Sequence, residues 1–141
     1  MQRVPEDLHA GFTREIIGAF YHVYNTLGYG FLEAVYQNAL AVTLSKRGHQ
    51  VEARRPVDVY FEGIVVGNYF ADLVVDGAVI VELKSVEALC DAHEAQLLNY
   101  LRATNIEVGL LLNFGPQPQV KRKVFPSSGK CRSSRKTPDS E

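Results

Sequence analysis

Apolar side chains recur at helical spacing in the first third of the chain. In residues 13–27 they return every three or four positions, and Gly28 follows as a stop signal. The same spacing returns in residues 31–47 and ends at Gly48. The pattern therefore predicts two consecutive helices before any strand.

Strand patterns occupy the middle of the chain. Residues 51–59 alternate apolar with polar side chains, as in a half-exposed strand, and the Glu62-Gly63 turn leads back into a second strand over residues 64–75. Gly67-Asn68 predicts a bend or bulge in that second strand. Residues 78–85 are apolar toward both faces apart from two charged side chains, which is typical of a central strand.

One more helix and one more strand complete the pattern. Asp91 is a candidate N-cap for a third helix that runs to Ala103. Residues 108–114 form a continuous apolar run, as in a strand buried on both faces. We therefore expect an α/β fold with a mixed central sheet of about four strands flanked by helices.

Length and composition predict one domain and a tail. The 141 residues, 46% of them hydrophobic, suffice for one sheet with helices and are too few for two domains. After Phe125 the composition changes to Ser, Lys, Arg and Pro without apolar periodicity. This change predicts a folded domain over residues 1–125 and a basic, Ser-rich disordered tail over residues 126–141.

Targeting signals and cysteine usage bear on the compartment. The N-terminus has no apolar segment of the secretory kind, and no stretch approaches the length of a membrane span. Cys90 and Cys131 lack the Cys/His spacing of a zinc site and fit a reducing compartment. We therefore expect a cytoplasmic protein with no membrane partner.

Charge is divided unevenly along the chain. Residues 1–120 carry 8 Lys and Arg against 14 Asp and Glu, a net of −6, whereas residues 121–141 carry 7 against 2, a net of +5. Proteins that bind nucleic acid usually present a basic surface. Two interpretations fit: either the substrate is not a long duplex, or the acidic residues gather around a metal beside a local basic edge. That edge would comprise Lys46, Arg47, Arg54 and Arg55.

Three charged residues interrupt the apolar central strands. Glu82 and Lys84 are two residues apart, so both side chains point to one face of their strand while Leu83 packs on the other. Asp72 belongs to the preceding strand, across the Asp76-Gly77 turn. Two carboxylates and an ammonium on one face suit a magnesium ion and an attacking water, and they indicate phosphodiester cleavage.

Strand parity tests whether Asp72 can share that face. A two-residue loop would put Asp72 opposite Val81 and leave Asp72 and Glu82 on opposite faces of the sheet. A three-residue loop over residues 75–77 pairs Asp72 with Ile80 and brings the charges to one face. An odd-length loop, with Gly77 in a left-handed conformation, is therefore required.

Simpler explanations exist for these charges. Acidic residues at strand ends are common, and a buried ion pair that serves only the structure is the main alternative. Because the neighbouring residues are apolar toward both faces, three charges among them would cost several kcal/mol unless they are paired or bound to metal. We therefore favour a joint metal-binding or catalytic role.

Two further groups of polar residues lie on predicted helices. Glu33 and Tyr36 are three residues apart, so the carboxylate lies beside the ring on a largely apolar surface. His93, Gln96 and Tyr100 form a polar stripe on the third helix. From this stripe Gln96 could orient the lysine or the attacking water, and Tyr100 could hold a phosphate oxygen. His93 fits the surface better than a magnesium site, because Mg²⁺ prefers oxygen ligands.

These motifs resemble a known family. Gly30, Glu33 and Tyr36 match a GxxExxY motif, and the chain is similar to the GxxExxY protein family of the PD-(D/E)xK nuclease-like superfamily. The resemblance covers nearly everything before the tail. It rests also on Ile16-Ile17-Gly18, Ala71-Asp72-Leu73, Val81-Glu82-Leu83-Lys84, the segment from His93 to Tyr100, and Asn113-Phe114-Gly115.

The resemblance implies a restriction-endonuclease-like core with a defined role for each residue. Asp72 and Glu82 would be metal ligands, and Lys84 would be the catalytic lysine. Glu33 would be the helical acid of the site. The QxxxY motif of the exonuclease-like branch is matched by Gln96 and Tyr100.

The expected reaction is metal-dependent hydrolysis of nucleic acid, with DNA favoured over RNA. Asp72, Glu82 and the Leu83 carbonyl are expected to hold Mg²⁺ or Mn²⁺, with Glu33 as a further ligand, direct or through water. Lys84 is expected to orient the water and stabilise charge. A free lysine has a pKa of about 10.4, which is too high for it to act readily as the general base.

The nuclease interpretation also predicts the substrate contacts and the partners. Tyr100 and Tyr36 are the expected substrate contacts. The partner is nucleic acid, and a homodimer is compatible with the sequence. The alternative is a non-catalytic module that keeps the nuclease fold and binds nucleic acid or protein.

Overall fold

The computed structural model describes residues 9–127. In this part of the chain no helix is long and apolar enough to cross a membrane. The elements are α1 (Ala10–Leu27), α2 (Glu33–Lys46), β1 (Val51–Phe61), β2 (Ile64–Val75), β3 (Val79–Lys84), α3 (Asp91–Arg102), β4 (Val108–Phe114) and β5 (Pro118–Val124).

The five strands form one mixed sheet in the order β1-β2-β3-β4-β5. Strands β3 and β4 are parallel, and the other neighbours are antiparallel. α3 connects β3 to β4, which supplies the crossover that parallel pairing requires. The α/β class and the mixed sheet expected from the sequence are confirmed, with one strand more than expected.

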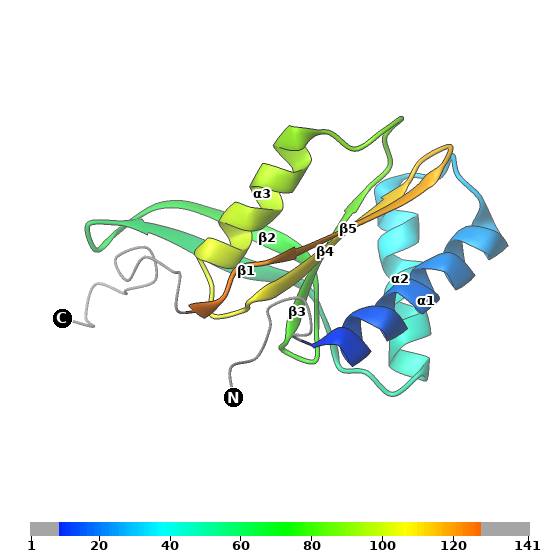
Figure 1. The fold of residues 1–141 in the computed structure, drawn as a ribbon, viewed down its shortest axis with the longest axis horizontal. Helices are drawn as coiled ribbons and strands as arrows, with labels where there is room; N and C mark the ends of the chain where they lie inside the picture. Colours follow the sequence, from blue (N-terminus) through cyan, green and yellow to red (C-terminus); the bar gives the residue numbers. More distant parts are fainter. Residues whose placement is uncertain (1–8, 128–141) are drawn as a thin grey trace.

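Helices cover both faces of the sheet (Figure 1). α1 and α2 pack on one face, where Phe20, Tyr36 and Phe114 are buried together. α3 packs on the other face, where Leu97 and Ile80 are buried. Since β3 and β4 are apolar toward both faces, they form the centre of this three-layer structure.

Three local expectations need correction or refinement. The sequence pattern did not predict the fifth strand, β5, because its apolar residues Val120 and Val124 are separated by the basic run of residues 121–123. The N-cap of α3 is Cys90 and not Asp91. The bulge expected near Gly67 is present. Val59 pairs with Gly67 and the next residue, Tyr60, pairs with Val65, so that residue 66 is the extra residue of β2.

The β2–β3 loop has the odd length that the shared face requires. It comprises Asp76, Gly77 and Ala78, because Val75 pairs with Val79. The parity is as predicted, but the register differs by two residues: continued past the described pairs, it places residue 72 opposite residue 82 and not opposite residue 80. Asp76 and Gly77 both have positive φ, of 55° and 63°, so the glycine accepts the middle position of the loop and not the last.

Side-chain contacts select this loop. His49 lies between two carboxylates, with Nδ1 2.6 Å from Asp76 and Nε2 2.7 Å from Glu15 of α1. The hydrogen bond to Asp76 is the main cause that raises the pKa of His49. Asp76 also accepts a hydrogen bond of 2.8 Å from the Gln50 backbone N–H. The turn is therefore held by residues far away in sequence.

The segment after β3 is held against the end of β4. Asn113 is fully buried, and its side-chain amide exchanges two hydrogen bonds of 3.0 Å with the backbone of Val86. Tyr24 of α1 donates a hydrogen bond of 2.6 Å to the carbonyl of Gly115. These contacts fix the chain directly after Lys84, which makes them part of the support of the site.

Gly115→Ala should destabilise the protein by about 3 kcal/mol. A Cβ at position 115 would overlap the carbonyl oxygen of Val86, which is backbone and cannot rotate away. The measurement is chemical denaturation. Gly18→Ala, at an exposed helical position with nothing within 4 Å, is the control and should be neutral or stabilising. Equal stability of the two variants would contradict the close approach.

Candidate active site

The site forms where β2 and β3 separate. Their ladder ends at the pair Leu73 and Val81, and beyond it carboxylates bridge the two strands. The backbone N–H of Asp72 donates to Glu82 Oε2 at 3.0 Å, and the N–H of Leu83 donates to Asp72 Oδ2 at 2.8 Å. The two acidic side chains therefore take the place of ladder hydrogen bonds and lie face to face.

The Glu82 carboxyl is strongly affected by this position. Its residue is only 5% exposed. Burial raises the pKa of Glu82 to about 8, and repulsion from Asp72 adds to the shift, while the Asp72 N–H and the charge of Lys84 oppose it. At neutral pH Glu82 therefore stays mostly protonated unless a cation neutralises the site.

The donor set fits a divalent metal. One oxygen of each carboxylate accepts a backbone N–H, and the described residues offer no further N–H donor to the second oxygen of Asp72 or Glu82. The Leu83 carbonyl points to the same side as its N–H, toward Asp72, because both groups of a strand residue face one neighbour. Two carboxylates with one carbonyl are oxygen ligands of the kind that Mg²⁺ binds together with waters and phosphate.

Lys84 lies beside the two carboxylates, but its ammonium is not paired with either of them. Within residues 9–127 it forms no salt bridge to either carboxylate. Its ammonium lies 3.5 Å from Oε1 of Gln96 on α3. The buried structural ion pair that competed with a catalytic role is therefore not formed. Half-buried Lys84 keeps N–H groups that could contact a water or a phosphate.

Two tyrosines cover the acidic pair from the side of α3. The ring of Tyr100 lies 4.2 Å from the ring of Tyr69 on β2. Burial raises the pKa of Tyr100 to about 12, and the charges of Glu82 and Asp72 contribute to the shift. The pKa of Tyr69 is raised as well, by burial first and then by Tyr100 and Glu82. Both hydroxyls therefore stay protonated and can donate hydrogen bonds near the carboxylates.

Glu33 is close to the site but does not join the two carboxylates. It is the exposed first residue of α2, and the contact with the site is made one helical turn later, where Gln37 donates to the Asp72 carbonyl at 3.2 Å. The described residues contain no group of three or more His, Cys, Asp or Glu side chains that could hold a metal. Glu33 as a further metal ligand, direct or through water, therefore stays a prediction, and its residue is exposed at the start of α2.

Tyr36 also lies elsewhere than its expected substrate-binding role requires. The side chain is fully buried between α1, α2 and the sheet, stacked at 4.2 Å on Phe114. Its hydroxyl donates to the Gly28 carbonyl at 2.6 Å and accepts from the Phe31 N–H at 3.1 Å. Tyr36 therefore fixes the loop before Glu33, and no surface of it is left for a substrate.

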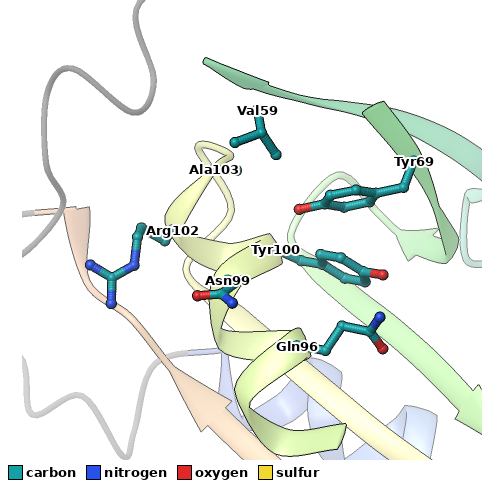
Figure 2. Close-up of a pocket in the computed structure, with 7 residues that line it drawn as sticks. All are labelled: Val59, Tyr69, Gln96, Asn99, Tyr100, Arg102 and Ala103. Atoms are coloured by element: carbon teal, nitrogen blue, oxygen red, sulfur yellow. The ribbon is translucent and has the colours of Figure 1, made fainter. Parts of the chain in front are cut away.

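A pocket of about 410 Å³ opens beside Lys84 and Gln96. It lies between the β1–β2 hairpin and α3 (Figure 2). The hairpin contributes Val59 and Tyr69, and α3 contributes Gln96, Asn99, Tyr100 and Arg102, followed by its C-cap Ala103. Of the catalytic residues expected from the sequence, Gln96 lines this mainly apolar recess and contacts Lys84 beside it.

Glu82→Gln should stabilise the protein in the absence of metal, by about 2–4 kcal/mol above pH 8. The folded wild type binds a proton at Glu82 up to pH of about 8, whereas the unfolded chain releases it near its ordinary value of 4.5. The wild type therefore loses stability as pH rises through this window, and glutamine does not. Urea denaturation in EDTA at pH 5, 7 and 9 measures the difference, and a difference that is constant with pH would contradict the raised pKa.

Sequence reasoning missed three residues that build this site. Gln37 carried a signal, because it stands one turn after Glu33 on the same helix face. Asn113 was visible as the single polar residue in the apolar run of β4. Tyr69 carried no local signal, since its pairing with Tyr100 joins two segments that only the fold brings together.

The site and its setting define a class of protein. An acidic pair, a lysine and a helix-borne glutamine meet at the opening between two central strands of an α/β fold. A family model for the PD-(D/E)XK nuclease superfamily matches residues 10–124, from the start of α1 to the end of β5. The chain belongs to that superfamily. No curated protein and no solved structure matches the chain significantly.

Proposed function

We propose that this protein is a divalent-metal-dependent nuclease that hydrolyses phosphodiester bonds at Asp72, Glu82 and Lys84. The observation that carries the proposal is the face-to-face carboxylate pair at the strand opening, in which Glu82 is buried, Asp72 is half-buried, and one oxygen of each accepts no backbone N–H. Membership of the PD-(D/E)XK nuclease superfamily supports it. The narrower resemblance, to the GxxExxY family, rests on the motif residues alone.

The acidic residues would hold the metal. Asp72, Glu82 and the Leu83 carbonyl are the proposed ligands of Mg²⁺ or Mn²⁺. When bound, such an ion polarises the scissile phosphate and lowers the pKa of a coordinated water. Backbone N–H groups fix both carboxylates, so the ligands are ordered before the ion arrives. Glu33, one turn from the contact with Asp72, is placed to act through water.

The other residues would position the reacting groups. Lys84 would donate a hydrogen bond to the attacking water and stabilise negative charge that develops on the phosphate. Gln96 would keep the lysine in place, since its Oε1 is 3.5 Å from the ammonium. The protonated hydroxyl of Tyr100 would donate to a phosphate oxygen. Gln96 and Tyr100 line the pocket, and Lys84 contacts Gln96.

Cleavage of defined substrates tests the proposal. Purified protein is incubated with labelled single-stranded and duplex DNA and RNA in Mg²⁺, Mn²⁺ or EDTA. We expect cleavage that requires metal, with DNA favoured over RNA. Lys84→Ala, prepared in parallel, controls for contaminating nucleases and should cleave at least about a hundredfold more slowly. Equal cleavage by both preparations, or none by the wild type with either metal, would overturn the proposal.

An interaction module remains the rival, and one surface favours it. The outer part of the β1–β2 hairpin carries exposed apolar side chains, with Phe61 62%, Ile64 66% and Val66 61% exposed. Such a patch suits contact with another protein or a second copy of the chain. The rival predicts no metal binding and no cleavage, so metal titration of the purified protein separates the two.

A further inference from the structure

The pocket beside the site has the size and lining of a site for a small planar group. Its volume of about 410 Å³ lies within the range of small-molecule sites. One wall is the aromatic pair of Tyr69 and Tyr100, with ring centres 4.2 Å apart. The other walls are the apolar Val59 and Ala103 and the amide of Asn99. A flat aromatic ligand could stack on these rings and be recognised through hydrogen bonds to its edge.

One polar group without a partner points into this pocket. In Figure 2 the Tyr69 hydroxyl points toward the side where Asn99 and Ala103 lie, whereas the Tyr100 hydroxyl points the other way, as does the amide of Gln96. Among the described residues neither tyrosine hydroxyl forms a hydrogen bond, although Tyr100 is buried and Tyr69 is half-buried. Buried tyrosine hydroxyls usually find a partner, which a ligand would supply.

Charge argues against a long duplex as the occupant. The described residues 9–127, which include the basic strand β5, carry 10 Lys and Arg against 12 Asp and Glu, a net charge of −2, whereas duplex binding depends on many phosphate contacts. Two cations of the expected basic edge are already engaged: Arg54 lies 4.6 Å from the Phe70 ring, and Arg55 is 3.7 Å from Glu52. Single strands bind more by stacking of bases on aromatic side chains, which this pocket provides.

We infer that the pocket formed by Val59, Tyr69 and Asn99 with Tyr100 takes one unpaired nucleobase, so that the substrate is a single-stranded nucleic acid. The inference rests on the proposed nuclease function. The base would stack on the tyrosine wall, and the Tyr69 hydroxyl and the Asn99 amide would bond its edge. Since Gln96 lines the pocket and contacts Lys84, the bound nucleotide would place a neighbouring phosphate at the carboxylates.

Binding of oligonucleotides with single missing bases tests this inference. The full-length Lys84→Ala variant in Mg²⁺ keeps the strand intact, and wild type in EDTA is run beside it. Single-stranded DNA and RNA octamers carry one abasic residue at each position in turn, which removes a base and keeps the phosphate. We expect one position at which base removal weakens binding at least about tenfold, the size of one lost stack. A 2-aminopurine at that position should be quenched on binding, and the chain has no tryptophan to interfere.

Variants of the pocket give a second measurement. Tyr69→Ala should remove the dependence on that base, whereas Tyr69→Phe should keep the quenching. Tyr21→Ala, an exposed tyrosine on the opposite helical layer, is the control and should bind as its parent does. Equal binding of all abasic octamers, or tighter binding of a paired duplex, would contradict the inference that the pocket binds a base.

The two proposals can fail separately. Metal-dependent cleavage together with binding that does not depend on any one base would support the nuclease and contradict the base pocket. Base-dependent binding without cleavage would support the base pocket and contradict the nuclease.

Discussion

Lys84→Ala should slow cleavage by about 10²–10³-fold while metal and substrate still bind. The ammonium is not committed to a salt bridge with Asp72 or Glu82, so its removal leaves the carboxylate pair and its backbone hydrogen bonds intact. What is lost is a charged donor at the reacting phosphate. Single-turnover cleavage and anisotropy of a labelled strand measure the two effects separately.

The control for this prediction is another lysine. Lys121→Ala removes an exposed lysine from β5 and should leave the cleavage rate unchanged. If Lys84→Ala lost strand binding together with cleavage, Lys84 would anchor the substrate and would not act on the transition state. If its cleavage rate matched that of Lys121→Ala, the lysine would have no part in the reaction.

Asp72→Asn should weaken Mn²⁺ binding at least about a hundredfold. Asparagine keeps the size of the side chain and an oxygen for the Leu83 N–H, which now bonds Asp72 at 2.8 Å, so the strand opening should keep its shape. The negative charge that balances the ion is removed. Because the repulsion that raises the pKa of Glu82 disappears as well, the metal-free variant should be more stable than the wild type at pH 8.

Calorimetric titration with Mn²⁺ measures the loss, and urea denaturation in EDTA measures the gain in stability. Asp58→Asn, at an exposed carboxylate of β1, is the matched control and should change neither quantity. Unchanged Mn²⁺ affinity in Asp72→Asn would remove the metal from the proposed reaction. Asp72 and Glu82 would then serve only the structure of the strand opening.

Local sequence rules predicted the elements that carry the proposed catalytic residues. Helical spacing located all three helices within a few residues, and apolar runs located four of the five strands. The period of two along a strand put Glu82 and Lys84 on one face, and the need for Asp72 on that face required an odd loop. These features depend on neighbours in the chain, which is why periodicity is sufficient to predict them.

Local rules failed where several segments compete for one position. An odd loop over residues 75–77 and one over residues 76–78 satisfy the same parity, so periodicity cannot choose between them. The choice is made by contacts across the fold, in which His49 and Gln50 hold the carboxylate of Asp76. The outcome matters for function, because the second register brings Asp72 directly opposite Glu82.

The fold class, the superfamily motifs and the shared face of Asp72, Glu82 and Lys84 all follow from local patterns in the chain. The exposure of Glu33, and the contact of Tyr69 with Tyr100 that lines a pocket, depend on how distant segments pack. Hydrophobic periodicity indicates which face of each element is buried, whereas the distance between two elements depends on how all the layers pack together.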